Sequence, residues 1–171
     1  KFGIPVFELE EARELVAACG ATVVGLHAHT GSGILTPQNW QDVGRALVAI
    51  AQDFAGLRVL DLGGGLGVPE KSGQPGLDMQ AVDAGIAEIR AAQPQLEIWL
   101  EPGRYLVAEA GVLLATVTQV KGKGQVMYVG ASTGMNSLIR PALYGAFHEI
   151  VNLSRWGDDM DRVVTIVGPI C

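Results

Sequence analysis

Cysteine, aromatic residues and long hydrophobic runs are all scarce in this sequence. Only two of its 171 residues are cysteines, Cys19 and Cys171, and 6% are aromatic. Two thiols at opposite ends of a chain make neither a disulfide framework nor a metal motif, and they are typical of a reducing compartment. The longest apolar stretches, such as residues 112–117, are far shorter than the ~20 residues that span a bilayer. We therefore expect a cytoplasmic protein that does not enter the membrane.

An excess of positive charge is also missing. Twelve Lys and Arg residues stand against eighteen Asp and Glu residues, which gives a formal net charge of −6. Such a chain has no basic field to hold a nucleic acid or an anionic membrane surface. Its 49% apolar residues and 23 glycines are typical of a globular, turn-rich α/β protein with a real core.

The first two thirds of the chain repeat a strand, loop and helix pattern. Short apolar runs expected to be strands alternate with amphipathic stretches expected to be helices: strands at 21–26, 57–62 and 96–100, helices at 38–53 and 78–92. The positions just after the strands are His29, Gly63 and Glu101, 34 and 38 residues apart. This cadence fits consecutive units of a (β/α)₈ barrel, whose functional site lies at the carboxyl ends of the strands. A doubly wound sheet would give similar spacing.

Beyond residue 110 the pattern becomes β-rich. The segments expected to form strands there are 112–120, 125–129, 146–153 and 162–167. We therefore predict a partial barrel domain over residues 1–110 and a partial all-β domain over 111–171. Three strand and helix units are fewer than a barrel needs, and open sheet edges are normally paired or covered. The sequence is expected to be a fragment of a longer enzyme.

Two histidines follow the first strand, in the order His27-Ala28-His29-Thr30-Gly31-Ser32. On a strand they share a face, and two imidazoles could bind a metal. A catalytic zinc site needs a third protein ligand, and the only other histidine is His148. We expect no metal. The pair could instead be packed and hydrogen-bonded, or His29 could stack on a planar ligand while residues 30–33 offer backbone N–H groups to an anion.

Glycines and an arginine follow the second and third strands. Residues 63–67 read Gly-Gly-Gly-Leu-Gly, which is neither a dinucleotide fingerprint nor a P-loop and is either a tight turn or a close backbone cradle for phosphate. Glu101 and Arg104 flank a Pro-Gly turn, as a loop-closing ion pair or as a site where the guanidinium binds an anion. These features together predict a site for a phosphorylated, planar ligand.

A second arginine stands four residues before a tyrosine, in Arg140-Pro141-Ala142-Leu143-Tyr144. On one helical turn the two would share a face. They could clamp a carboxylate together, or they could be a solvated arginine beside a core-packed tyrosine.

Several motifs in this order resemble those of the fold-type III pyridoxal-phosphate-dependent amino-acid decarboxylases. Residues 27–32 are similar to the family's H-x-H-x-G-S, residues 61–67 to D-L-G-G-G-x-G, and residues 101–104 to E-P-G-R. Residues 134–148 resemble the segment typical of the branch that acts on diaminopimelate. The resemblance implies an alanine racemase-like fold, in which a barrel that binds pyridoxal 5'-phosphate precedes a β domain.

The resemblance also implies a role for each matching residue. His29 would stack on the cofactor ring and Glu101 would bond its pyridine nitrogen. The residues implied to contact the phosphate are Ser32, Gly63, Gly64 and Gly65, with Gly103 and Arg104 against phosphate or substrate. Arg140 and Tyr144 would grip the distal carboxylate of the substrate. Cys171 matches the first residue of C-E-S-x-D, a catalytic thiol that reaches the site across a homodimer interface.

The activity implied is decarboxylation of meso-2,6-diaminopimelate to L-lysine. The alternatives are a related decarboxylase for ornithine, arginine or carboxynorspermidine, a metal-dependent barrel hydrolase, and a non-catalytic relative. The family's lysine that binds the cofactor covalently has no counterpart among Lys1, Lys71, Lys121 and Lys123. Ser132 and Thr133 stand where the family commonly has Asp-Ala. The isolated chain is therefore expected to be inactive.

Overall fold

The computed structural model describes residues 2–159 and 162–170. The chain divides into two compact units. The first unit contains residues 1–69 and 75–110, and the second contains residues 70–74 and 111–171. Residues 70–74 therefore group with the second unit, although they lie between two elements of the first.

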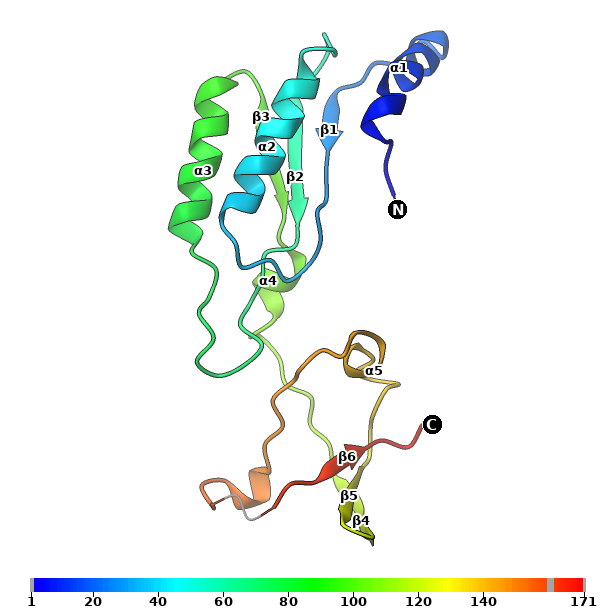
Figure 1. Ribbon diagram of the computed structural model, residues 1–171, viewed down its shortest axis with the longest axis vertical. Coiled ribbons are helices and arrows are strands. Elements are labelled where there is room, and N and C mark those ends of the chain that lie inside the picture. Colours follow the sequence, from blue (N-terminus) through cyan, green and yellow to red (C-terminus); the bar gives the residue numbers. More distant parts are fainter. Residues whose placement is uncertain (1, 160–161, 171) are drawn as a thin grey trace. The chain divides into compact units, whose positions relative to one another are not determined.

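The first unit is a parallel sheet with two helices on one face (Figure 1). Its elements are η1 (Val6–Glu8), α1 (Leu9–Ala18), β1 (Gly25–His27), α2 (Gln38–Ala51), β2 (Val59–Gly64), α3 (Met79–Ala92), β3 (Glu97–Glu101) and α4 (Gly103–Val107). The strand order is β1-β2-β3, and both neighbouring pairs are parallel. Because all three strands are parallel, their carboxyl ends lie at the same edge of the sheet.

The core of this unit lies between β2 and the helices α2 and α3. Leu60 and Leu62 of β2 are 0% and 1% exposed, and Trp40 of α2 is fully buried. Burying an aliphatic side chain of this size stabilises the fold by ~1.5–3 kcal/mol. Successive residues of a strand point to opposite faces. The leucines therefore direct Asp61, which lies between them, to the face that the helices leave uncovered.

Close contact between α2 and α3 depends on a small residue in the interface. A Cβ added to Gly44 of α2 would lie 2.7 Å from Cγ1 of Ile89 of α3, which is closer than carbon atoms pack. Asp78 caps α3, since its Oδ1 accepts hydrogen bonds from the N–H groups of Gln80 and Ala81 at 3.0 Å. Both predicted helices are confirmed, with ends within two residues of those expected.

The predicted strands of this unit are also confirmed, although each begins later than expected. β1 is only three residues long, and residues 21–24 precede it without strand structure. The helices α1 and α4 were not predicted. α4 begins directly after the Pro-Gly turn expected at residues 102–103. Among the described residues, none of the helices has the length and hydrophobicity that crossing a bilayer requires.

The second unit contains a small mixed sheet in the order β4-β5-β6. Its elements are β4 (Val117–Lys123), β5 (Val126–Ala131), α5 (Arg140–Tyr144), η2 (Leu153–Arg155) and β6 (Thr165–Val167). β4 and β5 form an antiparallel hairpin that turns at Gly124, whose φ is 61°. β6 lies parallel to β5. The chain is thus an α/β protein, as expected.

One predicted strand of the second unit is wrong. Residues 146–152 have no regular structure, and residues 153–155 form the helical turn η2. Their apolar side chains include Ile150 and Leu153, which are 67% and 61% exposed. Within the described residues these side chains have no neighbouring strand on which to pair, so apolar composition alone does not produce a strand here. β4 likewise begins at Val117 instead of residue 112.

Candidate functional site

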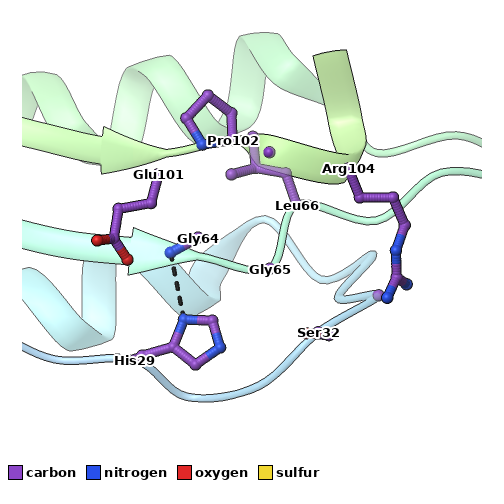
Figure 2. Close-up of a pocket in the computed structure, with 10 residues that line it drawn as sticks. His29, Ser32, Gly64, Gly65, Leu66, Glu101, Pro102 and Arg104 are labelled. Carbon is purple, nitrogen blue, oxygen red and sulfur yellow. Dashed lines mark hydrogen bonds between the residues drawn. The ribbon is translucent and has the colours of Figure 1, made fainter. Parts of the chain in front are cut away.

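A pocket lies in the first unit, where the three parallel strands end. It has a volume of about 280 Å³. The residues that line it follow the ends of all three strands: His29, Ser32, Gly33, Gly64, Gly65, Leu66, Glu101, Pro102, Gly103 and Arg104. Figure 2 shows these residues around the end of β2. The structure therefore brings together the predicted site residues of this unit, except that Gly63 lies beside the pocket without lining it.

The ring of His29 is oriented by the backbone of β2. The N–H of Gly64 donates a hydrogen bond to Nδ1 of His29 at 3.3 Å, drawn as a dashed line in Figure 2. Because Nδ1 accepts, the proton of the neutral ring is on Nε2. The bond fixes both the tautomer and the position of the imidazole at the mouth of the pocket.

The glycines at the end of β2 are required by the close approach of neighbouring backbone segments. A Cβ on Gly64 would overlap the carbonyl oxygen of Glu101, and a Cβ on Gly65 would overlap that of Gly31. Gly65 also has a φ of 84°, which side chains other than glycine rarely adopt. The cradle is therefore built of backbone, which suits the close approach of a phosphate group.

Arg104 reaches the other side of this cradle. Its Nη1 lies 3.7 Å from the position of a Cβ on Gly33, and no ion pair involves Arg104 in the part of the chain that the structure describes. The loop-closing pair between Glu101 and Arg104, one of two alternatives from the sequence, is wrong, because Glu101 contacts His27 instead. A guanidinium without a carboxylate partner beside backbone glycines is suited to an anion.

His27 and Glu101 lie with Asp61 on the uncovered face of the sheet. The possible ligand atoms of the three residues lie within 4.8 Å of one another. Sequence reasoning did not select Asp61. The alternation of residues 60–62, in which two leucines flank a carboxylate, could have identified Asp61 as a residue on the opposite face of the strand. His27 thus lies with two carboxylates and not with His29.

Arg140 and Tyr144 occupy the two ends of α5 in the second unit. Nη2 of Arg140 donates to Oε1 of Glu70 at 2.9 Å, and Nη1 lies 3.1 Å from Nε2 of His148. The arginine side chain is 28% exposed, whereas Tyr144 is 74% exposed. The expected helical turn is confirmed, and the alternative of a solvated arginine beside a buried tyrosine is wrong. Sequence reasoning missed Glu70.

Cys171, the predicted catalytic thiol, lies outside the described residues.

A comparison with protein families decides the assignment of the chain. Residues 1–108 match the model described as the pyridoxal binding domain of pyridoxal-dependent decarboxylases. The chain belongs to the pyridoxal-dependent decarboxylase family. Pyridoxal phosphate is the cofactor of this family, which confirms the cofactor that the family resemblance implies.

Relatives within the family are named as diaminopimelate decarboxylases. The chain is 36% identical to the diaminopimelate decarboxylase of Archaeoglobus fulgidus, over all of this chain and 43% of that protein. It is 30% identical to the structure of diaminopimelate decarboxylase from M. jannaschii in complex with L-lysine, with a TM-score of 0.81, over all of this chain and 42% of the other. The chain therefore spans less than half the length of these relatives.

A more distant structure shares the fold. The lysine/ornithine decarboxylase of Vibrio vulnificus, solved with cadaverine, matches all of this chain and 47% of its own with a TM-score of 0.81 at 20% identity. At this identity the likeness concerns the fold alone.

Proposed function

We propose that this chain is part of a pyridoxal-phosphate-dependent decarboxylase that converts meso-2,6-diaminopimelate into L-lysine and carbon dioxide. The observation that carries the proposal is the pocket itself, in which three motifs from separate strand ends converge on one backbone cradle. The named function of the relatives, at 30–36% identity over the whole chain, supports the same substrate.

The residues of the pocket fit the cofactor. A phosphate is small, anionic and rich in acceptor oxygens. Gly64 and Gly65 offer it backbone at positions where a side chain would not fit. Arg104 offers a guanidinium that has no ion pair within the described residues. Ser32 and Gly103 line the same pocket and would also contact the phosphate, with Gly63 supporting the cradle from beside it. When bound, the cofactor supplies an electron sink for the charge that remains when carbon dioxide leaves.

Two side chains would orient the ring of the cofactor. His29 is fixed by Gly64 at the mouth of the pocket, where its ring can lie against a planar group. Glu101 lines the same pocket, and its carboxylate would accept a hydrogen bond from the protonated pyridine nitrogen. Holding that proton on the nitrogen makes the ring a better acceptor of electrons.

Arg140 and Tyr144 would bind the second carboxylate of the substrate. Diaminopimelate carries a carboxylate at each end, and a guanidinium forms two parallel hydrogen bonds with such a group. The hydroxyl of Tyr144, on the same helical turn and exposed, would add a third. A substrate with a cationic end would need an acidic residue in place of this pair.

The remaining expectations concern the whole protein. We propose that the first unit belongs to an alanine racemase-like barrel domain over residues 1–110 and the second to a β domain over 111–171. We further propose a cytoplasmic homodimer in which Cys171 of one subunit completes the site of the other.

Carbon dioxide release by the full-length protein tests the proposal. Purified protein with pyridoxal phosphate is assayed with meso-diaminopimelate, L-ornithine and L-arginine, and the amine product is identified. We expect turnover of diaminopimelate alone, with L-lysine as product. Preference for ornithine or arginine would refute the substrate assignment, and absence of the cofactor's visible absorbance would refute the cofactor assignment.

A metal-dependent hydrolase is the second candidate, because His27, Asp61 and Glu101 could together hold a metal ion. It predicts stoichiometric bound metal and no dependence of activity on pyridoxal phosphate. Elemental analysis beside the visible spectrum of the same sample separates the two.

A further inference from the structure

The imidazole of His27 and the carboxylate of Glu101 meet across the middle strand of the parallel sheet. Nε2 of His27 lies 3.2 Å from Oε2 of Glu101. β1 and β3, which carry them, are not neighbours, since β2 lies between them. β2 ends in Gly63 and Gly64, so the end of the middle strand contributes no side chain.

The surroundings of His27 define which atom donates the proton. Asp61 is the register partner of His27 on β2, and its Oδ1 accepts a hydrogen bond from the N–H of Gly63 at 2.9 Å. The imidazole thus lies near two carboxylates, and an ionised carboxylate can only accept. Nε2–H of His27 is the donor and Oε2 of Glu101 the acceptor.

This contact is the only one that restrains the Glu101 carboxylate within the described part of the chain. Its side chain is 53% exposed and that of His27 is 51% exposed, so packing does not fix either rotamer. One oxygen of Glu101 is bonded and the other is available. A free glutamate side chain samples several rotamers, and ordering it at each binding event has an entropic cost.

We propose that His27 is a positioning residue that holds Oε2 of Glu101, so that Oε1 is presented to the ring nitrogen of the cofactor. The inference rests on the proposed function, in which Glu101 bonds that nitrogen. His27 acts through Glu101 and does not itself touch the cofactor. It turns a flexible carboxylate into one that is already oriented before the cofactor binds.

The test compares variants of the full-length protein by two measurements that do not depend on turnover. These are the dissociation constant for pyridoxal phosphate from equilibrium dialysis, and the ¹⁵N chemical shift of the ring nitrogen of labelled cofactor. His27→Leu removes the donor, while His27→Gln keeps an Nε2–H at similar reach. Glu97→Gln is the matched control, because Glu97 also belongs to β3 and its side chain bonds only Trp99 among the described residues.

We expect His27→Leu to weaken cofactor binding by about 3- to 30-fold, as loss of a hydrogen bond to a charged group at a half-exposed site implies. The ring nitrogen signal should move toward its unprotonated value. His27→Gln should restore most of the cofactor affinity and most of the ¹⁵N chemical shift. Glu97→Gln should match the wild type in both measurements. In a Glu101→Gln background, His27→Leu should add less than about twofold, because coupled residues are not additive.

Two results would overturn the inference while leaving the proposed function intact. One is that His27→Leu and Glu97→Gln have equal dissociation constants and chemical shifts. The other is that the losses of cofactor affinity are additive in the double variant of His27 and Glu101. A wild-type protein that does not bind pyridoxal phosphate would overturn the proposed function and this inference with it. His27→Phe, which keeps a ring but has no donor, provides the same comparison if the leucine variant does not fold.

Discussion

Arg140→Ala is the substitution that most directly tests the substrate assignment. The structure gives Arg140 two partners in the second unit, Glu70 at 2.9 Å and His148 at 3.1 Å. The substitution therefore removes two things at once: a contact that stabilises the second unit and, under the proposed function, the group that binds the distal carboxylate. The two effects differ in size and in the measurement that detects them.

The structural contribution is the smaller of the two. The side chains of Arg140 and Glu70 are 28% and 39% exposed, and partly exposed ion pairs contribute about 1 kcal/mol or less. The substrate contribution is a charge-assisted pair of hydrogen bonds, whose loss leaves a carboxylate unpaired and costs about 2–4 kcal/mol. The latter corresponds to about 30- to 900-fold in kcat/KM for diaminopimelate.

Three variants separate these contributions in the full-length protein. Arg140→Ala should lower kcat/KM by the larger factor and the thermal midpoint by a few degrees, while occupancy by pyridoxal phosphate stays normal. Glu70→Gln breaks the same ion pair but keeps the guanidinium, so it should lower the thermal midpoint to a similar extent without raising KM. Arg140→Lys should restore little activity, because an ammonium lacks the planar fork of the guanidinium.

One result refutes the reasoning. If Glu70→Gln and Arg140→Ala lower kcat/KM by the same factor, the arginine contributes only through its ion pair. The carboxylate clamp is then wrong, and with it the main structural reason for choosing diaminopimelate.

The remaining predictions concern the first unit. Gly65→Ala should abolish binding of pyridoxal phosphate in equilibrium dialysis and destabilise the protein, because a Cβ there overlaps a carbonyl oxygen. The control Gly76→Ala, whose Cβ would be 3.9 Å from its nearest neighbour, should bind the cofactor normally. Asp78→Ala should lower the free energy of unfolding by about 1 kcal/mol in urea titration, through loss of the helix cap. Trp40→Phe should lower it by about 1–3 kcal/mol in the same titration, since the indole N–H donates to the carbonyl of Gly64 at 3.2 Å in a fully buried site.

The parts of the first unit that follow a period were predictable from the sequence. The helices α2 and α3 have apolar stripes at helical spacing, and the cap at Asp78 is a local signal. For the glycines at residues 63–65 the sequence left two interpretations open, a tight turn or a close backbone cradle for phosphate. These features depend on residues that are close together in the sequence, so the sequence alone can indicate them.

The contacts between distant residues could not be predicted in this way. Glu70 meets Arg140 from 70 positions away, and His27 meets Glu101 from 74. Nothing local distinguishes Glu70 from the other exposed acids of the chain. The strand predicted at residues 146–153 is wrong for the same reason. A strand forms only where a second segment pairs with it, and the sequence of one segment does not show whether such a partner is present.

The short segment 70–74 also has a consequence for how such a protein can be recombined. It is encoded within the first unit but belongs to the second, where Glu70 pairs with Arg140 and the ammonium of Lys71 lies 5.6 Å from the ring of Phe147. A gene crossover at residue 111 between two homologous decarboxylases would give a second unit whose segment 70–74 came from the other parent. Such a chimera would keep both folds and lose these contacts unless the two parents agree at positions 70, 71, 140 and 147. Transfer of residues 70–74 together with 111–171 would keep them.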